Sequence, residues 1–355
     1  MSMEHAKPKF SQSQVSEMVK TLYRMTAAEI KPLPSYDDQN FYVATSEGGE
    51  YVLKIMNSED SKNPAITEVQ TCAMSFLHQN GLPAQTVVPT TSGQLISLQE
   101  MDCGYGCQKY LVRLLTYLPG ITISKVPLTP KLLYETGKMA ARMDVILKKM
   151  EHPHLRTLQR ESFIWSLSNI PLLEEYLRVL DGDPLQEVVK SVIDQYKTSV
   201  LPKRSNFHKC INHGDFNDLN VLVQPDENDG YKISGILDFG DMNDGYYIHE
   251  LAITLMYMMT VHPEPVEVGG PVLAGWESVL PLNDAEKDCL YLLVLCRFCQ
   301  SLVMARYSVT LQPENAEYLM ITSKRGVHIL QQLWTLGKEQ VEKRWFESAA
   351  KFGEK

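Results

Sequence analysis

A polar motif in two halves constrains this chain more than any other feature. The first half reads His213-Gly214-Asp215-Phe216-Asn217-Asp218-Leu219-Asn220, and the second reads Leu237-Asp238-Phe239-Gly240-Asp241. Between them, residues 221–223 and 231–237 have the apolar patterns of two strands, and the turn formers of residues 224–230 predict that these strands pair as a β-hairpin. The hairpin would bring Asn220 and Asp238 together at one end, directly opposed at about 5 Å between backbones.

This arrangement predicts transfer of a phosphoryl group from a nucleotide. The amide oxygen of Asn220 and the carboxylate of Asp238 suit a shared Mg²⁺, which prefers oxygen ligands. Asp215, on the loop just ahead, suits the acceptance of a proton from an attacking hydroxyl. Two alternatives stay open: the carboxylates cap turns and helix ends, or the chain is a two-metal phosphoesterase. A phosphoesterase needs further ligands in series, and the other histidines lack such spacing.

Length and composition predict two lobes. A chain of 355 residues exceeds the usual size of one hydrophobic core, and 44% hydrophobic with 22% charged residues is typical of globular proteins. Strands are expected at residues 41–45, 51–56, 86–99 and 110–116, and helices at 11–30, 64–81, 130–150, 171–180, 184–199, 246–261, 283–309 and 314–346. We therefore expect an α+β, protein-kinase-like two-lobed fold, with residues 1–117 as a β-rich nucleotide-clamping lobe and residues 118–355 as a larger helical lobe for catalysis and substrate binding.

Charge and cysteine usage indicate the setting and the partners. The net charge of −9 disfavours nucleic acid and anionic membrane surfaces and suits a cationic substrate. The most apolar stretch, residues 248–261, is interrupted by His249 and Glu250 and is too short to span a bilayer. With no secretory signal apparent, seven cysteines, an odd number, predict reduced thiols and a cytoplasmic protein. Cys103 and Cys107 fall in a loop and are open to adventitious oxidation.

A nucleotide site also needs a cation over the phosphates and an anion to orient it. Lys54 lies in the middle of an expected strand and is the candidate phosphate-binding lysine, with Glu68 on the next helix as its expected partner. Ser35 and Asn40 lie in the turn where a kinase covers the phosphates. The break at Thr116-Tyr117-Leu118 is expected to meet the nucleotide base through backbone groups.

Most of the candidate substrate contacts lie in or after the second half of the motif. Acidic side chains there would bind an ammonium group next to the reacting hydroxyl, and an arginine would bind a carboxylate bidentately. The alternatives are helix capping for the acids and a buried ion pair for the arginine. The candidate residues are Asp218, Asp241, Asp244, Glu250 and Arg297.

The sequence resembles the aminoglycoside phosphotransferase and choline kinase group of small-molecule kinases, and within it the kinases of 5-hydroxy-L-lysine. The resemblance covers nearly the whole chain, and its specific matches are residues 32–41, 110–120, 211–223, 234–242, 268–275 and 297–304. It implies GTP-dependent phosphorylation of the side-chain hydroxyl of 5-hydroxy-L-lysine. It also implies that Asp215 accepts the proton, that Asn220 and Asp238 bind Mg²⁺ and that Lys54 binds phosphate.

Other assignments within and outside this group stay open. The donor would be ATP if the chain were instead a choline or homoserine kinase-like enzyme, and a non-catalytic nucleotide-binding protein would have the same fold. Asn217-Asp218-Leu219 stands where the wider group often has His or Pro-Gly before the metal-binding Asn, so substrate contacts of antibiotic kinases do not transfer. A protein kinase is disfavoured, because no Arg precedes Asp215 and no Ala-Pro-Glu follows Asp238 within activation-loop distance.

Overall fold

The computed structural model describes the chain as two compact units. The described residues are 7–35, 37–102, 106–227, 230–311, 313, 316–320 and 323–352. Met1–Pro119 and Glu151–Thr157 form the first unit, and Gly120–Met150 and Leu158–Lys355 form the second. The chain therefore passes from the first unit to the second after Pro119, where the sequence suggested residue 117. No sequence pattern indicated that residues 151–157 group with the first unit.

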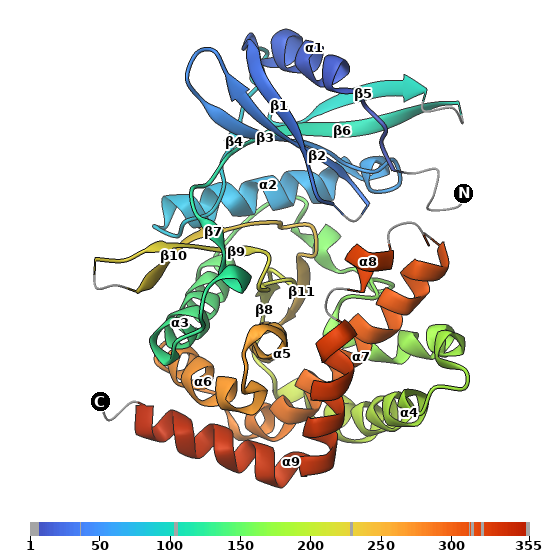
Figure 1. Ribbon diagram of the computed structural model, residues 1–355, viewed down its shortest axis with the longest axis vertical. Coiled ribbons are helices and arrows are strands. Elements are labelled where there is room, and N and C mark those ends of the chain that lie inside the picture. Colours follow the sequence, from blue (N-terminus) through green and yellow to red (C-terminus); the bar gives the residue numbers. More distant parts are fainter. Residues whose placement is uncertain are drawn as a thin grey trace. The chain divides into compact units, whose positions relative to one another are not determined.

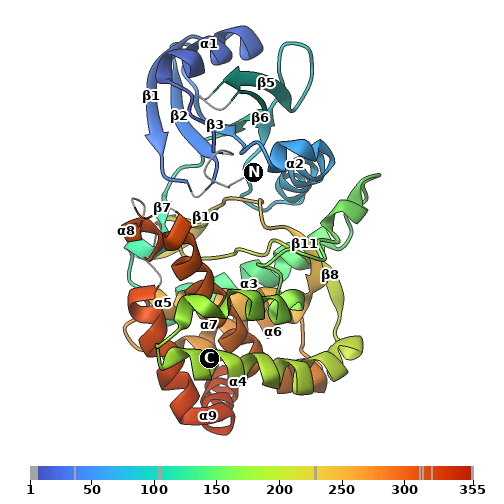
Figure 2. The ribbon, with the colours of Figure 1, turned by 90° about the vertical axis from the view of Figure 1, so that its right-hand side faces the viewer.

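The first unit is built on an antiparallel sheet (Figure 1). Its elements are α1 (Gln12–Tyr23), β1 (Ala27–Leu33), β2 (Gln39–Thr45), β3 (Glu50–Ile55), α2 (Pro64–Gln79), β4 (Val87–Val88), β5 (Ser97–Asp102) and β6 (Cys107–Thr116). The strand order is β1-β2-β3-β6-β4, and β5 also pairs with β6. Figure 2 shows α1 and α2 on opposite sides of this sheet. Val15 and Val19 of α1 pack in one core cluster with Leu53 and Leu114 of the sheet.

Residues 27–33 form a strand, so the prediction of one helix over residues 11–30 was wrong. α1 begins with a capping box between Ser11 and Gln14 and ends at Arg24, which has the left-handed φ of 53°. β1 then pairs with β2 at the edge of the sheet. An edge strand tolerates Pro32, which cannot donate to a ladder. Pairing with β2 thus makes residues 27–33 a strand, although their sequence was compatible with a longer helix.

The second unit combines short strands with long helices (Figure 1). Its elements are β7 (Ile121–Thr122), α3 (Pro130–Leu147), a 3₁₀ segment (Leu167–Leu180), α4 (Leu185–Gln195), β8 (Lys209–Asn212), β9 (Val221–Pro225), β10 (Tyr231–Ile236), β11 (Asn243–Tyr246), α5 (Tyr247–Val261), α6 (Gly269–Glu277), α7 (Asp284–Leu311), α8 (Ala316–Leu319) and α9 (Ser323–Phe352). β9 and β10 form the predicted hairpin, which β7 extends along β9. β8 and β11 form a second antiparallel pair that was not predicted.

Helix α6 was also not predicted, because Gly269-Gly270-Pro271 is a pattern typical of a loop. Its glycines instead permit close packing between helices. A Cβ on Gly275 would lie 1.9 Å from the backbone oxygen of Tyr134, and a Cβ on Gly137 would lie 2.0 Å from the backbone oxygen of Val272. Only glycine allows the backbones of α3 and α6 to approach this closely.

Helices α5 and α7 form the core that supports the site. Within the described part of the chain, α7 alone is long and apolar enough to cross a membrane, yet 94% of its most apolar window is buried inside the protein. A helix buried on all sides has no polar face, so its polar residues need partners within the core. Arg297 and Gln300 of α7 are 1% and 0% exposed. Their partners lie in the site described next.

Candidate active site

Residues 213–220, hereafter the catalytic loop, connect β8 to β9. The Asp238 segment connects β10 to β11, and β11 pairs with β8 while β10 pairs with β9. Two strand pairs therefore hold both ends of both loops, which brings the two halves of the sequence motif together. Arg160 further fixes the second loop by donating to the backbone oxygens of Gly240 at 3.0 Å and Met242 at 3.3 Å.

His213 is a structural residue of the catalytic loop. Its side chain is 0% exposed, its Nε2 donates to the backbone oxygen of Leu237 at 2.9 Å, and its Nδ1 accepts from the backbone N–H of Asp215 at 3.2 Å. Burial lowers the pKa of His213 to about 4. The ring is therefore neutral at pH 7, with its proton on Nε2, and it ties the loop to the end of the hairpin.

Side-chain donors hold the carboxylate of Asp215 at both oxygens. Asn217 Nδ2 donates to Oδ1 at 2.8 Å, and Asn220 Nδ2 donates to Oδ2 at 2.8 Å. Arg297 Nη2 lies 3.4 Å from Oδ1. The Oδ1 of Asn217 in turn accepts from the backbone N–H groups of Leu219 and Asn220, both at 2.9 Å, so the turn and the carboxylate share one anchor. Asn217 was missed from the sequence, although its position two residues after Asp215 suits an Asx turn.

Glu250 of α5 fastens the catalytic loop to the core. It is 0% exposed, and its Oε2 accepts from the backbone N–H of Gly214 at 3.1 Å. Burial raises the pKa of Glu250 to about 7, while backbone hydrogen bonds from Gly214, His213 and Phe216 act in the opposite direction. A carboxylate that is enclosed and bound to the loop backbone does not reach a substrate. The expectation that Glu250 binds an ammonium group is corrected accordingly.

A cluster of carboxylates surrounds the reacting position. Burial raises the pKa of Asp215 well above its ordinary value, Asp241 and Asp238 raise it further, and Arg297 opposes them. The Asp215 side chain keeps 23% of its exposure, so it stays accessible. A site with this excess of negative charge attracts cations, whether a metal ion or an ammonium group.

The hairpin corrects the predicted opposition of Asn220 and Asp238. The backbone oxygen of Asn220 accepts from the N–H of Leu237 at 2.8 Å, so Leu237 lies opposite it and Asp238 is one residue further on. An irregularity between Ile233 and Gly235 shifts the register by one residue toward Asp238, because the register of the outer part of the hairpin would place Ile236 opposite Asn220. Asp238 has a left-handed φ of 54°, a conformation that Asp tolerates better than most residues.

The donor set of this corner fits Mg²⁺. Asn220 uses its amide nitrogen on Asp215, so its amide oxygen, the group that binds hard cations, faces the other way. Asp238 carries an exposed carboxylate whose Oδ1 accepts from the N–H of Gly240 at 3.2 Å. Its charge acts on both His213 and Asp215, which locates it beside the catalytic loop. Among the described residues no group of three or more His, Cys, Asp or Glu side chains is arranged to hold a metal, so any ion here relies on the nucleotide for further ligands.

In the first unit, Lys54 has Asp38 as its ionic partner. Lys54 is 7% exposed, and its Nζ lies 3.1 Å from Asp38 Oδ2. Asp38 is itself fixed, because its Oδ1 accepts from the backbone N–H of Asn57 at 2.9 Å and from the Asn57 side chain at 3.2 Å. Glu68 was the wrong choice of partner: it is exposed on α2 and lies 3.8 Å from His154.

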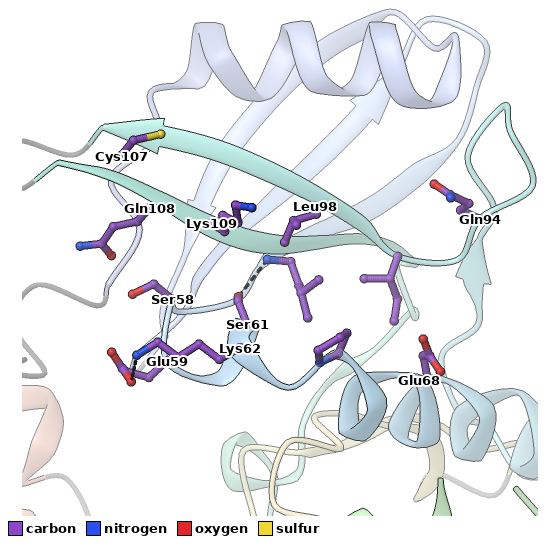
Figure 3. Close-up of a pocket in the computed structure, with 13 residues that line it drawn as sticks. Ser58, Glu59, Ser61, Lys62, Glu68, Gln94, Leu98, Cys107, Gln108 and Lys109 are labelled. Atoms are coloured by element: carbon purple, nitrogen blue, oxygen red, sulfur yellow. Dashed lines mark hydrogen bonds and ion pairs between the residues drawn. The ribbon is translucent and has the colours of Figure 1, made fainter. Parts of the chain in front are cut away.

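Glu68 instead lines a surface groove of about 770 Å³ between α2 and strands β5 and β6. Figure 3 shows the side chains around it, with Leu98 and Lys109 on the strands. Cys107 also lines this groove and is an exposed free thiol. Cys103, with which it was expected to oxidise, lies outside the described residues.

The turn and the break expected to meet the nucleotide have mostly internal partners. Ser35 Oγ donates to the backbone oxygen of Asp38. The N–H of Thr116 donates to Thr86, its C=O accepts from Gln85 at 3.0 Å, and the N–H of Tyr117 donates to Glu50. Among the described residues, no backbone group is hydrogen-bonded to the backbone of Leu118. The N–H groups of Thr116 and Tyr117 are therefore already hydrogen-bonded within the protein. A nucleotide base could bind the backbone of Leu118, or a carbonyl oxygen that accepts a second hydrogen bond.

The remaining substrate candidates differ in exposure. Asp218 is 9% exposed, and burial raises its pKa to about 6. Asp241 is half-buried beside Asp215, whereas Asp244 is exposed on β11. Neither Asp241 nor Asp244 caps the next helix, since the N-cap of α5 is Tyr246 and has no side-chain hydrogen bond. Arg297 is buried against the catalytic loop and is not placed to receive a substrate carboxylate.

A family model decides what this loop and hairpin belong to. The model of the phosphotransferase enzyme family matches residues 29–286, which include Lys54 and the whole catalytic loop. The chain belongs to this family. Hydroxylysine kinase of Danio rerio is 64% identical over 352 residues, covering 99% of each chain. Hydroxylysine kinase of Bos taurus is 49% identical over 357 residues, covering 98% of this chain and 95% of that one.

Solved structures confirm the predicted kinase-like fold. An amicoumacin kinase, hAmiN, aligns with a TM-score of 0.67 at 17% identity, covering 89% of this chain and 94% of its own. A microcompartment-associated aminopropanol kinase aligns with a TM-score of 0.64 at 16% identity, covering 91% and 98%. The chain is therefore a phosphotransferase that uses a nucleotide and takes an alcohol group of a small molecule as acceptor.

Proposed function

We propose that this phosphotransferase transfers the γ-phosphoryl group of GTP to the side-chain hydroxyl of 5-hydroxy-L-lysine, with Asp215 as the base. The observation that carries the choice of substrate is the 64% identity, over 99% of both chains, to the hydroxylysine kinase of Danio rerio. The site is compatible with that substrate, because the carboxylates Asp215, Asp238 and Asp241 lie close together and favour a cationic ligand.

Each step of the transfer has a residue suited to it. The substrate hydroxyl gives its proton to Asp215 while its oxygen forms a bond to the γ-phosphorus. The bond from that phosphorus to the bridging oxygen breaks, and GDP leaves. Asn217 and Asn220 hold the Asp215 carboxylate, which keeps its orientation fixed during attack. Asp241 is the candidate for the substrate ammonium group.

The phosphates of the nucleotide would be bound by a basic side chain and by polar groups. Lys54, oriented by Asp38, is the candidate phosphate ligand, with Ser35 and Asn40 nearby in the turn. Mg²⁺, when bound, would be held by Asn220 and Asp238 and would neutralise charge on the phosphates. We further propose a cytoplasmic protein: the described cysteines are all free thiols, which suits a reducing compartment.

The test is a panel of acceptors assayed separately with GTP and with ATP in the presence of Mg²⁺. The panel contains 5-hydroxy-L-lysine, L-homoserine, ethanolamine and choline. L-lysine is the matched control, because it has the same charges without the hydroxyl. We expect phosphorylated 5-hydroxy-L-lysine, faster with GTP, and no product from L-lysine. Preferred turnover of another acceptor would contradict the proposed substrate, preference for ATP would contradict the proposed donor, and phosphate release without any acceptor would indicate a hydrolase.

A further inference from the structure

Arg297 is a buried cation whose position needs an explanation. It lies in the apolar helix α7 and is 1% exposed. A guanidinium group removed from water is strongly destabilising unless it is paired and hydrogen-bonded. A residue of this kind in the core is therefore retained for something other than the stability of the helix.

The contacts of Arg297 converge on the catalytic loop. Its Nη2 donates to the backbone oxygen of Gly214 at 3.1 Å and lies 3.4 Å from Asp215 Oδ1. Its Nη1 donates to the backbone oxygen of Trp165 at 2.8 Å. The planar guanidinium also lies over the rings of Trp165, at 5.1 Å, and Tyr257, at 5.4 Å. This set of contacts requires the flat fork of an arginine and cannot be made by a lysine.

The opposite side of the same backbone segment is held by Glu250. The N–H of Gly214 donates to Glu250 Oε2, and its C=O accepts from Arg297 Nη2. Side chains of α5 and α7 therefore both bind the backbone of this one residue. Gly214 has φ of +83°, and a Cβ there would lie 2.5 Å from the backbone oxygen of Asp241. The chain has no freedom at this point. A displacement of Arg297 would therefore also move the adjacent Asp215 carboxylate.

Gln300, one turn further along α7, secures the other end of the arginine. Its Oε1 lies 3.4 Å from Arg297 Nη1. Its Nε2 donates to the backbone oxygens of Ile164 at 2.8 Å and Ser166 at 3.0 Å, which flank the Trp165 carbonyl that Arg297 binds. Arg297 is thus itself fixed in the core, as a residue that orients another must be.

We propose that Arg297 is a positioning residue that holds the Asp215 carboxylate in its reactive orientation and does not bind the substrate. This proposal rests on the proposed role of Asp215 and assigns Arg297 a task within it. A shift of the base by a fraction of an ångström costs turnover rather than substrate affinity. The same geometry corrects the expectation from sequence that Arg297 binds the substrate carboxylate.

The test compares Arg297→Lys with Arg306→Lys in the full-length protein. Arg306 lies on the same helix and pairs with Asp183 at 2.9 Å, away from the catalytic loop, so it is the matched control. We expect Arg297→Lys to lower kcat by about 10- to 100-fold and to leave KM for acceptor and nucleotide within about threefold. Arg306→Lys should leave both constants unchanged. A rise in KM for the acceptor with kcat retained would overturn the proposal, as would an unchanged kcat.

A double-mutant cycle distinguishes a role through Asp215 from a general structural role. In the Asp215→Asn background, Arg297→Lys should cost little further kcat, because the group it positions has already been removed. Additive losses in kcat would overturn the proposal. If Asp215→Asn alone retained full activity, the proposed base would be wrong instead, so the two failures are distinct.

Two further measurements cover a variant that folds poorly. Guanidinium ions added to Arg297→Ala should restore part of its kcat, which a loss of packing alone would not allow. Gln300→Met leaves the arginine in place but releases the Ile164 and Ser166 carbonyls and the contact to Nη1, and it should lower kcat several-fold with KM unchanged. A folded Gln300→Met enzyme with wild-type kcat would overturn the proposal.

Discussion

The catalytic loop of the second unit and the phosphate turn of the first, residues 35–40, are built in different ways. In the catalytic loop, the Asp215 carboxylate has donors on both oxygens, and Gly214 is bound on both its N–H and its C=O. In the phosphate turn, Asp38 is fixed by Asn57 and Lys54, but the buried Oδ1 of Asn40 has no partner among the described residues. Tyr36 of this turn lies outside them.

This difference indicates a division of labour. The Asp215 carboxylate is oriented by hydrogen bonds within the folded protein before any ligand binds. This avoids reorganisation during the reaction. In the phosphate turn, the buried amide oxygen of Asn40 has no hydrogen-bond partner among the described residues and is available to a ligand or to its water. We infer that the nucleotide completes the first unit's site, whereas the catalytic loop of the second unit is held in place without it.

The largest expected effect is that of Asp215→Asn. Because the amide cannot accept the hydroxyl proton, we expect kcat to fall by about 10²- to 10⁴-fold. Nucleotide affinity, measured by calorimetry, should stay close to wild type. Asp226→Asn, a change of the same kind near the hairpin turn, is the control and should leave kcat unchanged. Unchanged turnover in Asp215→Asn would exclude it as the base.

Lys54 and its partner come next. Lys54→Met removes the cation over the phosphates and should raise KM for GTP by about 10-fold or more. Asp38→Asn removes the ionic partner that orients Lys54, so it should raise KM for GTP several-fold. Glu68→Gln, at the carboxylate that the sequence favoured, should have no effect on KM, because Glu68 is exposed and lies beside His154. A larger effect from Glu68→Gln than from Asp38→Asn would restore the original assignment.

A matched pair of asparagines tests the division of labour itself. Asn217→Ala removes an anchor that binds two backbone N–H groups and Asp215, so it should lower the free energy of unfolding by about 1–3 kcal/mol without ligand. Asn40→Ala removes a buried acceptor that has no hydrogen-bond partner among the described residues, so it should change the free energy of unfolding by less than about 0.5 kcal/mol. For GTP affinity we expect the opposite order, with Asn40→Ala weakening binding more than Asn217→Ala does. Equal losses of stability would contradict the comparison.

The smallest expected effect concerns the pH dependence of stability. The pKa of Glu250 is raised from 4.5 to about 7 by burial, so the folded protein binds this proton more tightly than the unfolded chain does. Its contribution is complete below pH 4.5 and is lost as the pH rises to about 7. Unfolding by urea, followed through the buried Trp276 and Trp345, should therefore show a decline over this range.

Glu250→Gln should flatten that decline. Glu277→Gln, a change of the same kind on α6 where the carboxylate pairs with Lys287 at 3.6 Å, should leave it as in wild type. Asp144 of α3 is also fully buried, and burial together with Glu250 raises its pKa in the same direction. A decline that Glu250→Gln does not alter would show that Glu250 is already ionised in the folded protein.

Local sequence patterns predicted the hairpin and most of the long helices, because strand pairing across a short turn and helical periodicity depend on neighbouring residues. They failed where a partner comes from a distant element. Asp38 rather than Glu68 pairs with Lys54, because the loop before β2 folds back along β3. No periodicity shows which residues of α5 and α7 reach the catalytic loop. The sequence therefore identified Glu250 and Arg297 as important and gave them the wrong partners.

A glycine-rich segment was also misinterpreted, because its composition suggested a loop where the structure has a helix. The run at residues 269–271 has the composition of a loop, yet it begins α6, where Gly275 and Gly137 allow two helices to touch. The preference of glycine for turns is local, and close packing between helices overrides it. β8 and β11 were missed for a similar reason, since each is four residues long and pairs with a partner about thirty residues away.

Backbone hydrogen exchange with and without GTP and Mg²⁺ tests the central claim most directly. The N–H groups of Gly214, Asp215 and Leu219 donate to Glu250, His213 and Asn217. They should be protected in the free protein, with little change when nucleotide binds, while protection around residues 37–41 should increase. Rapid exchange throughout the catalytic loop of the free protein, slowed by the nucleotide, would contradict a transfer site that the fold orients in advance.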